Sequence, residues 1–221
     1  MNKAVILISG GMDSCVTAAS AKADGYVSSF LHVNYGQRTQ MRELKAFHDI
    51  AEHYMIEERF VVDISHFSII GGSCLTDKNI EIPDAKLDNL NIPVSYVPFR
   101  NANILSAAVS LAEVLKAVAI YIGAVEEDSS GYPDCRRTFF DMFEEVIDSG
   151  TKPETKIKIV TPLITLTKKE IVEKGISLNT PLHLTWSCYK NEDTPCGKCD
   201  SCALRTRGFL QAGIKDPLDP S

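Results

Sequence analysis

Short apolar runs alternate with longer helix-forming segments along most of the chain. The apolar runs are rich in β-branched residues and bounded by turn residues, which is typical of buried parallel strands. We expect these strands at residues 4–8, 26–33, 59–64, 117–123 and 157–160. The segments after them predict helices at residues 15–23, 39–54, 101–115, 139–147 and 167–175. This alternation predicts an α/β fold with a doubly wound, parallel, five-stranded sheet and right-handed crossovers.

The turn after the first predicted strand carries two adjacent glycines, Gly10 and Gly11, just before a helix start. Glycine lets the backbone approach a ligand closely, and the free amides that open a helix attract anions. The segment Ser9–Ser14 therefore predicts a phosphate site, with hydroxyls from both serines. Asp13 would repel a phosphate, so we expect it either to cap the helix or to hold Mg²⁺ against the phosphates.

Basic side chains follow at other turns near the predicted carboxyl ends of the strands, where doubly wound sheets bind their ligands. Arg38, after the second strand, faces phosphate or is a solvated residue at a helix start. Arg100 precedes a helix that we expect Asn101 to cap, and it either meets an anion or lies on the surface. Thr167 and Glu170 have capping-box spacing. Lys168 between them could reach the phosphates, but we expect a surface lysine.

Two stretches interrupt the regular pattern. Residues 65–98 contain two adjacent glycines and three prolines, and we expect part of this long section to cover a ligand. Residues 125–136 follow the fourth strand and combine acidic, aromatic and basic side chains. There, Tyr132 could stack on a flat heterocycle, Asp134 could accept hydrogen bonds from its N–H edge, and Arg136 could hold a carboxylate. The alternative is a turn whose charges are solvated.

Composition limits the classes of function. A chain of 221 residues, 44% hydrophobic and 24% charged, fits one globular α/β domain with a small appendage. No segment approaches the ~20 apolar residues of a membrane span, and the first strand leaves no room for a signal peptide. We therefore expect a cytoplasmic protein that does not contact a membrane. The net charge of −6 argues against a broad nucleic-acid interface.

Four of the seven cysteines, Cys188, Cys196, Cys199 and Cys202, lie close together near the C-terminus. Four thiolates at this spacing favour a closed structural zinc site. Iron–sulfur ligation is the main alternative, and a redox dithiol fits less well because all four cysteines would be ligands. We expect residues 186–221 to form a small zinc-binding module packed on a nucleotide-binding domain of residues 1–185, with a closing helix that ends near Gly213.

Taken together, these motifs resemble a known family. Ser9–Ser14 alone is similar to the phosphate loop of N-type (PP-loop) ATP pyrophosphatases. Its combination with residues 35–38, 97–101 and 131–136 and with the cysteine spacing resembles the 7-cyano-7-deazaguanine synthases of queuosine biosynthesis, over residues 3–213. The resemblance implies a Rossmann-like, adenine nucleotide alpha hydrolase-like fold.

The resemblance also implies a reaction: ATP-dependent conversion of 7-carboxy-7-deazaguanine and ammonia into the 7-nitrile through an activated carboxylate and an amide. It implies one Zn²⁺ held by the four cysteines, Mg²⁺ with ATP as co-substrate, and a homodimer. We expect Asp13, Ser14 and Arg100 to serve catalysis, and Tyr132, Asp134 and Arg136 to bind the deazapurine. The expected ATP-binding residues are Ile8, Ser9, Gly10, Gly11, Met12, Asp13, Ser14, Cys15, Val16, Thr17, Ala18 and Arg38.

Two other functions compete with this interpretation. A tRNA sulfur-transfer or lysidine-type enzyme on the same scaffold would need a basic surface and reactive cysteines, which the acidic charge and the cysteine cluster disfavour. A zinc-bearing nucleotide sensor would bind ATP without chemistry. Sustained ATP consumption that requires both the deazapurine acid and ammonia distinguishes an enzyme from a sensor.

Overall fold

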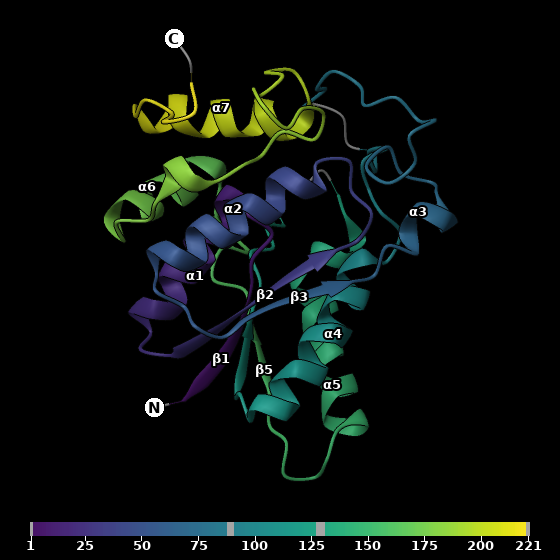
Figure 1. Cartoon of the computed structure of the whole chain (residues 1–221), viewed down its shortest axis with the longest axis vertical. Coiled ribbons are helices and arrows are strands. Elements are labelled where there is room, and N and C mark those ends of the chain that lie inside the picture. Colours follow the sequence, from purple (N-terminus) through teal and green to yellow (C-terminus); the bar gives the residue numbers. More distant parts are fainter. Residues whose placement is uncertain (1, 88–90, 127–130, 220–221) are drawn as a thin grey trace.

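A computed structural model describes residues 2–87, 91–126 and 131–219. Its centre is a five-stranded, all-parallel sheet in the order β3-β2-β1-β4-β5 (Figure 1). The strands are β1 (Lys3–Leu7), β2 (Val27–Asn34), β3 (Arg59–Asp63), β4 (Ala119–Tyr121) and β5 (Lys158–Val160). The predicted fold class is confirmed, and β4 is shorter than the apolar run at residues 117–123 that predicted it.

Helices cover both faces of this sheet (Figure 1). They are α1 (Met12–Ala23), α2 (Gln40–His53), α3 (Phe67–Ile70), α4 (Arg100–Leu115), α5 (Arg137–Gly150), α6 (Lys168–Ser177) and α7 (Asp200–Ala212), with 3₁₀ turns at Pro133–Cys135 and Leu182–Leu184. The capping box of Thr167 and Glu170 begins α6 as predicted. The predicted end at Gly175 is wrong, because α6 continues to Ser177. The glycine serves close packing against α1, where a Cβ at this position would lie 3.0 Å from Val16 Cγ2.

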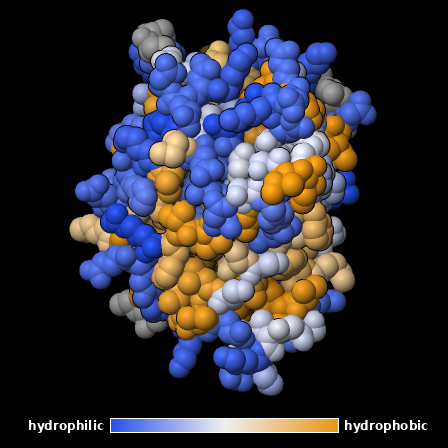
Figure 2. Space-filling model, turned by 45° about the vertical axis from the view of Figure 1, so that its right-hand side comes forward, coloured by the Kyte–Doolittle hydropathy of each residue, from blue (hydrophilic) through white to orange (hydrophobic). Residues whose placement is uncertain are grey.

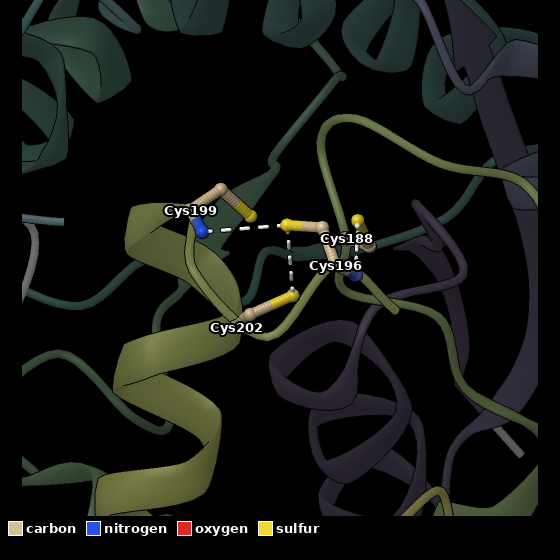
Figure 3. Close-up of side chains that lie close together, drawn as sticks. All are labelled: Cys188, Cys196, Cys199 and Cys202. Carbon is tan, nitrogen blue, oxygen red and sulfur yellow. Dashed lines mark hydrogen bonds between the residues drawn. The ribbon is translucent and has the colours of Figure 1, made fainter. Parts of the chain in front are cut away.

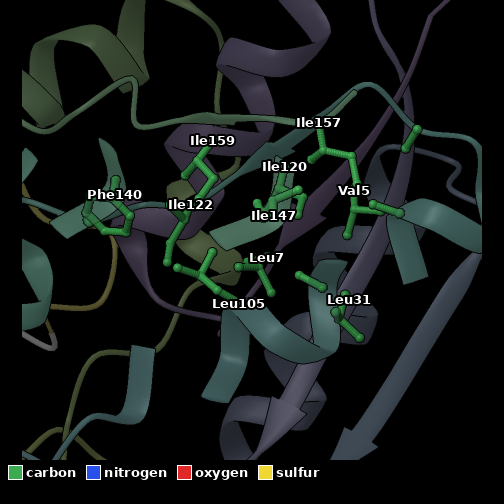
Figure 4. Packing of buried hydrophobic residues seen from close by; sticks show 14 of the residues in the cluster. Val5, Leu7, Leu31, Leu105, Ile120, Ile122, Phe140, Ile147, Ile157 and Ile159 are labelled. Carbon is green, nitrogen blue, oxygen red and sulfur yellow. The ribbon is translucent and has the colours of Figure 1, made fainter. Parts of the chain in front are cut away.

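The two faces follow from the alternation of side chains along the strands. Val5 and Leu7 of β1 point into a cluster formed with α4 and α5 (Figure 4). Ala4, Ile6 and Ile8 point to the opposite side, into a cluster with α1 and α2. Because both faces are buried, the strands read as continuous apolar runs in the sequence.

The strand order reverses between β1 and β4, so a crevice opens where the chain leaves these strands. The predicted phosphate loop, residues 9–14, follows β1 at this point. Gly123, just after β4, packs against it so tightly that a Cβ there would lie 3.0 Å from backbone atoms of Asp13 and Ser14. The switch in strand order therefore places the loop, and close packing fixes it.

The irregular section packs mainly against the C-terminal segment, and its predicted cover over a ligand stays a prediction. None of the described residues of 65–98 lines the cavity above the phosphate loop. Cys74 and Leu75 instead pack in one cluster with Trp186 and Cys188, and Ala85 N donates to Lys198 O at 2.8 Å. This section therefore covers the cysteine segment, and its far end supports the crevice wall, where Ser95 Oγ lies 2.8 Å from the Tyr132 hydroxyl. Residues 88–90 of this section and 127–130 of the predicted 125–136 loop lie outside the described residues.

The packing of Gly123 gives a stability prediction. Gly123→Ala should lower the free energy of unfolding by about 1–3 kcal/mol, because backbone atoms of Asp13 and Ser14 must move to admit the methyl group. Urea unfolding followed by circular dichroism measures the change. Gly150→Ala, at a glycine with nothing near its would-be Cβ, is the matched control and should be neutral or slightly stabilising. Equal effects of the two substitutions would contradict the close contact.

Candidate functional site

The phosphate loop presents unpaired amides at the start of α1. Gly11 is the N-cap, and no side chain caps the helix, so its first amides lack intrahelical partners. Ser9 Oγ accepts from Gly11 N at 3.2 Å and lies 3.2 Å from Ser14 Oγ, and Ser14 Oγ donates to Gly11 O at 2.9 Å. Amides, hydroxyls and the positive end of the helix dipole together form an anion site.

Asp13 does not cap α1; it forms an ion pair across the crevice. Lys168 Nζ, at the start of α6, lies 2.7 Å from Asp13 Oδ2. The prediction of a surface lysine is wrong: Lys168 is 8% exposed. Gly208 of α7 packs directly against Lys168, since a Cβ on this glycine would lie 2.9 Å from Lys168 Cβ and 3.0 Å from its carbonyl oxygen.

The second carboxylate oxygen of Asp13 is the notable atom. Asp13 Oδ1 is buried and has no hydrogen-bond partner among the residues that the structure describes. Burying a carboxylate oxygen without a partner is costly, so a ligand is expected to satisfy it. An oxygen ligand beside a phosphate site suits Mg²⁺, which prefers carboxylate and phosphate oxygens. Asp13 therefore fits the metal-holding role and not the capping role.

A cavity of about 280 Å³ opens over the loop. Its floor is the carboxyl ends of the central strands, and its walls come from α2, α4, α6 and the C-terminal segment. Among the predicted site residues, those that line it are Ile8, Ser9, Gly11, Met12, Asp13, Ser14, Arg100 and Tyr132. The others, which do not line it, are Gly10, Cys15, Val16, Thr17, Ala18, Arg38, Asp134 and Arg136.

The arginines divide between the cavity and the surface. Arg100 projects over the ring of Tyr35, 5.1 Å from its centroid, and its Nη2 donates to Asn101 Oδ1 at 3.3 Å. Arg38 faces away from the cavity and donates to the carbonyls of Asp77 and Ile80, so it holds the irregular section. Arg136 is exposed. Of the three, Arg100 alone lies where a bound anion would be.

Asp134 makes a structural contact, while its other carboxylate oxygen, Oδ1, is buried and has no hydrogen-bond partner among the described residues, so the predicted ligand contact stays a prediction. Its Oδ2 accepts from Asn101 N at 2.9 Å, and its carbonyl accepts from Asn101 Nδ2 at 2.9 Å. Asp134 therefore supplies the capping acceptor at the first turn of α4 that we expected from Asn101 itself. The helix begins one residue early, at Arg100, after Phe99 in a left-handed conformation (φ 57°). This left-handed turn moves Asn101 from the cap into the helix.

The four predicted cysteines converge into one cluster. Their Sγ atoms all lie within 4.8 Å of one another, with Cys188 and Cys196 on the segment before α7 and Cys199 and Cys202 at the start of that helix (Figure 3). Tetrahedral zinc with ~2.3 Å bonds requires sulfur atoms about 3.8 Å apart, and Cys196 Sγ lies 4.0 Å from Cys202 Sγ. The cluster therefore has the ligand set and the size for a metal ion.

Backbone amides prepare this cluster for an ion. Lys190 N and Asn191 N each lie 3.3 Å from Cys188 Sγ, and Cys196 N lies 3.4 Å from it. Hydrogen bonds from Cys199 and Cys202, with support from these amides, lower the pKa of the Cys188 thiol. A thiolate is the form that binds metal, so the surrounding donors favour ligation.

One residue joins the cysteine segment to the phosphate loop. Trp186 N donates to Gly10 O at 2.8 Å, and Trp186 Nε1 donates to Asn191 O at 3.2 Å. Arg42 of α2 packs over the Trp186 ring, 4.5 Å from its centroid. The sequence does not predict this contact, because a tryptophan beside a cysteine cluster does not indicate which loop it will meet. Nor does it predict Glu43, which lines the cavity.

Comparison with known proteins identifies the family. A sequence model described as queuosine biosynthesis protein QueC matches residues 3–213. Curated proteins named 7-cyano-7-deazaguanine synthase from Chlorobium phaeobacteroides (strain DSM 266) and Chlorobium chlorochromatii (strain CaD3) are 59% and 58% identical over 98% of the chain, and 96% and 95% of their own lengths. The chain belongs to the QueC family. The predicted family is thereby confirmed.

Solved structures outside the QueC family share its fold. A 4-thiouridine synthetase in complex with RNA and bound ATP superposes with a TM-score of 0.52 at 19% identity, over 96% of this chain and 50% of the other. A predicted subunit of a tRNA methyltransferase from Methanocaldococcus jannaschii gives 0.51 at 14% identity, over 100% and 93%. None of the helices in the described residues is long and apolar enough to span a membrane.

The capping contact of Asp134 can be tested by stability. Asp134→Ala should lower the free energy of unfolding by about 1–2 kcal/mol, because the first turn of α4 loses its acceptor. Urea unfolding measures this. Asp148 of α5 forms an exposed ion pair with Lys156, and Asp148→Ala should change the free energy of unfolding by less than about 0.5 kcal/mol. An Asp134 variant as stable as the Asp148 variant would refute the structural role.

Proposed function

We propose that the chain is an ATP-dependent carbon–nitrogen ligase that converts 7-carboxy-7-deazaguanine and ammonia into 7-cyano-7-deazaguanine. Family membership supports the reaction, since the curated relatives carry this enzyme's name. The observation that carries it in the structure is the open phosphate loop, with its uncapped amides and the Asp13–Lys168 pair, at the switch point of the sheet. A cavity beside that loop offers room for the second substrate.

Each part of the cavity has a role in this proposal. The phosphates of ATP bind the amides of residues 12–14 and the hydroxyls of Ser9 and Ser14, with Lys168 as a counter-charge. Mg²⁺ fits at Asp13 Oδ1, where it would neutralise phosphate charge. Arg100 faces the carboxylate or the phosphates, and the ring of Tyr132 stacks on the flat deazapurine. We propose that residues 8–18 form the nucleotide loop, with Cys15–Ala18 acting through the helix, since they do not line the cavity.

The chemistry needs positioning more than a side-chain nucleophile. A carboxylate is a poor electrophile until its oxygen becomes a leaving group, which transfer of an adenylyl group from ATP achieves. Ammonia then displaces AMP and forms an amide. A second activation, of the amide oxygen, allows loss of that oxygen and gives the nitrile. The protein holds the reactants together and stabilises the charge that develops on phosphate oxygens.

The cysteine cluster fits a structural zinc ion, since four thiolates leave no open position for a substrate. Zinc there would fix the segment that carries Trp186 against the phosphate loop.

The remaining partners follow from the surface. We propose that the protein acts in the cytoplasm on free small molecules without binding nucleic acid, in keeping with its net charge of −6. We also propose a homodimer. Exposed apolar side chains lie on or next to α4 and α5, and Figure 2 shows apolar atoms gathered over the lower half of its view. These side chains are Phe99, Val114, Met142 and Val146. A second copy presenting the same face would cover them by two-fold symmetry.

The reaction can be tested directly with purified protein. Given ATP, Mg²⁺, ammonium and 7-carboxy-7-deazaguanine, the wild type should yield amide and then nitrile, followed by mass spectrometry. Lys168→Ala should lower kcat/KM by about 100-fold, because Asp13 loses its partner and the phosphates lose a buried cation. Lys169→Ala, at the exposed neighbouring lysine, should match the wild type.

Three outcomes separate the alternatives. Absence of amide and nitrile from the wild type would refute the enzyme assignment. ATP binding without turnover would favour a nucleotide sensor. Normal turnover by Lys168→Ala would leave the reaction standing but remove that lysine from the site.

The metal assignment makes a second prediction. Elemental analysis should find one zinc ion per chain, and Cys199→Ser should lose the metal and lower Tm by more than about 5 °C, since metal binding is coupled to folding. Cys74 is a buried cysteine that is not one of the four expected metal ligands, so Cys74→Ser should retain the metal whatever its effect on packing. Iron in place of zinc, or a metal-free Cys199 variant as stable as the wild type, would contradict the assignment.

A further inference from the structure

Glu43 places a carboxylate in the wall of a cavity otherwise suited to anions. It lies in the first turn of α2, and its backbone carbonyl sits 2.6 Å from where a Cβ on Gly10 would be, so it borders the phosphate loop. Its Oε1 accepts from Thr39 Oγ1 at 2.7 Å, and its Oε2 accepts from Gln37 Nε2 at 3.1 Å. Gln37 is itself held, because its Oε1 accepts from Tyr35 N at 2.9 Å. The carboxylate is therefore fixed by neutral donors.

The charged groups around Glu43 leave it without a direct counter-charge. No ion pair to Glu43 occurs within residues 2–87, 91–126 and 131–219. Burial raises its pKa to about 7, although Thr39, Gln37 and, from α4, Arg100 oppose this; Glu192 of the C-terminal segment adds to it. Tyr35 faces it from the end of β2, and burial keeps that phenol neutral by raising its pKa. Glu43 can thus exist as carboxylate or as acid near neutral pH.

A carboxylate here would repel both anionic substrates, so its charge suits a cation. Ammonia dissolved at pH 7 is almost entirely ammonium, which cannot attack a carbonyl until it loses a proton. Of the other acidic groups that line the cavity, Asp13 is already paired with Lys168, and Asp200 lies in the first turn of α7.

We propose that Glu43 binds the ammonium ion and removes its first proton, which delivers neutral ammonia to the activated carboxylate; this inference rests on the proposed function. The new N–C bond forms as the C–O bond to AMP breaks, and AMP leaves with the electron pair of that bond. The nitrogen loses its second proton to a phosphate oxygen of the departing AMP. Acyl-adenylate, ammonium and carboxylate thus give amide, singly protonated AMP and the neutral acid of Glu43, which returns its proton to water.

Glu43→Gln keeps the shape of the side chain and removes the base. At pH 7 its kcat/KM for ammonium should fall by about 100-fold or more, as is typical when a general base is lost, while KM for ATP stays within about twofold. The wild type should lose activity as the pH falls below about 7, because Glu43 becomes protonated. The activity of the variant should rise about tenfold for each unit by which the pH is raised, because the variant uses only the free ammonia in solution.

Hydroxylamine separates proton removal from all other effects of the substitution. Its conjugate acid is far stronger than ammonium, so it is a neutral nucleophile at pH 7 and needs no base. With hydroxylamine in place of ammonium, Glu43→Gln should form the hydroxamate at a rate within a few-fold of the wild type. Equal losses with both nucleophiles would overturn the proposal, since the carboxylate would then serve positioning or substrate binding.

A stability measurement shows that the variant is folded. The folded-state pKa of Glu43 lies above its unfolded value, so the stability it contributes is present at low pH and is lost as the pH rises toward 7. Glu43→Gln should therefore have a higher Tm than the wild type at pH 8 and a similar Tm at pH 5. A variant less stable than the wild type at pH 8 would contradict the buried charge.

Glu52→Gln, at an exposed position on the same helix, is the matched control and should leave the activity and the pH profile unchanged. An active wild type with an unaffected Glu43→Gln variant would refute this inference alone. An inactive wild type would refute the proposed function itself.

Discussion

The site depends on a loop that keeps its amides free while its backbone is held rigidly. Three segments contact residues 9–14, and two of these contacts, at Gly10 and Gly123, leave no room for a Cβ. The carbonyl of Glu43 adjoins Gly10, Trp186 donates to the Gly10 carbonyl, and Gly123 lies against Asp13 and Ser14. An anion site built from backbone donors works only if those donors stay in place when the anion is absent. The surrounding packing supplies this pre-organisation without occupying the amides.

The cavity is lined by charged side chains of both signs. At the loop, Lys168 and the start of α1 are positive, and Asp13 offers one free oxygen to a cation. Arg100 lies over Tyr35, while Glu43, which borders the loop at Gly10, has a carboxyl group that no ion pair neutralises among the described residues. Because the net charge of the protein is −6, its overall field does not attract anions, and affinity must come from these local groups.

The sequence was sufficient for features encoded in neighbouring residues. The five strands, the phosphate loop and the cysteine cluster were predicted because apolar runs, glycine turns and ligand spacing are local patterns. Lys168 was misjudged because its partner is Asp13, 155 positions away. The capping contact of Asp134 was not predicted because an acceptor supplied from another segment, 33 residues from Asn101, leaves no mark in the helix sequence. Part of residues 65–98 was expected to cover a ligand, and nothing in their composition indicates the cysteine segment as a packing partner.

The contact between Trp186 and Gly10 joins two segments that are synthesised far apart in time. A chain emerging from the ribosome exposes its phosphate loop early, but Lys168 follows Asp13 by 155 residues, and Trp186 and Gly208 follow later still. Contacts of such large sequence separation form late, because the intervening chain must be ordered first. A truncated chain would therefore hold the sheet's central strands without the residues that brace the loop. The loop is thus braced only after the segment that carries Trp186 has been synthesised.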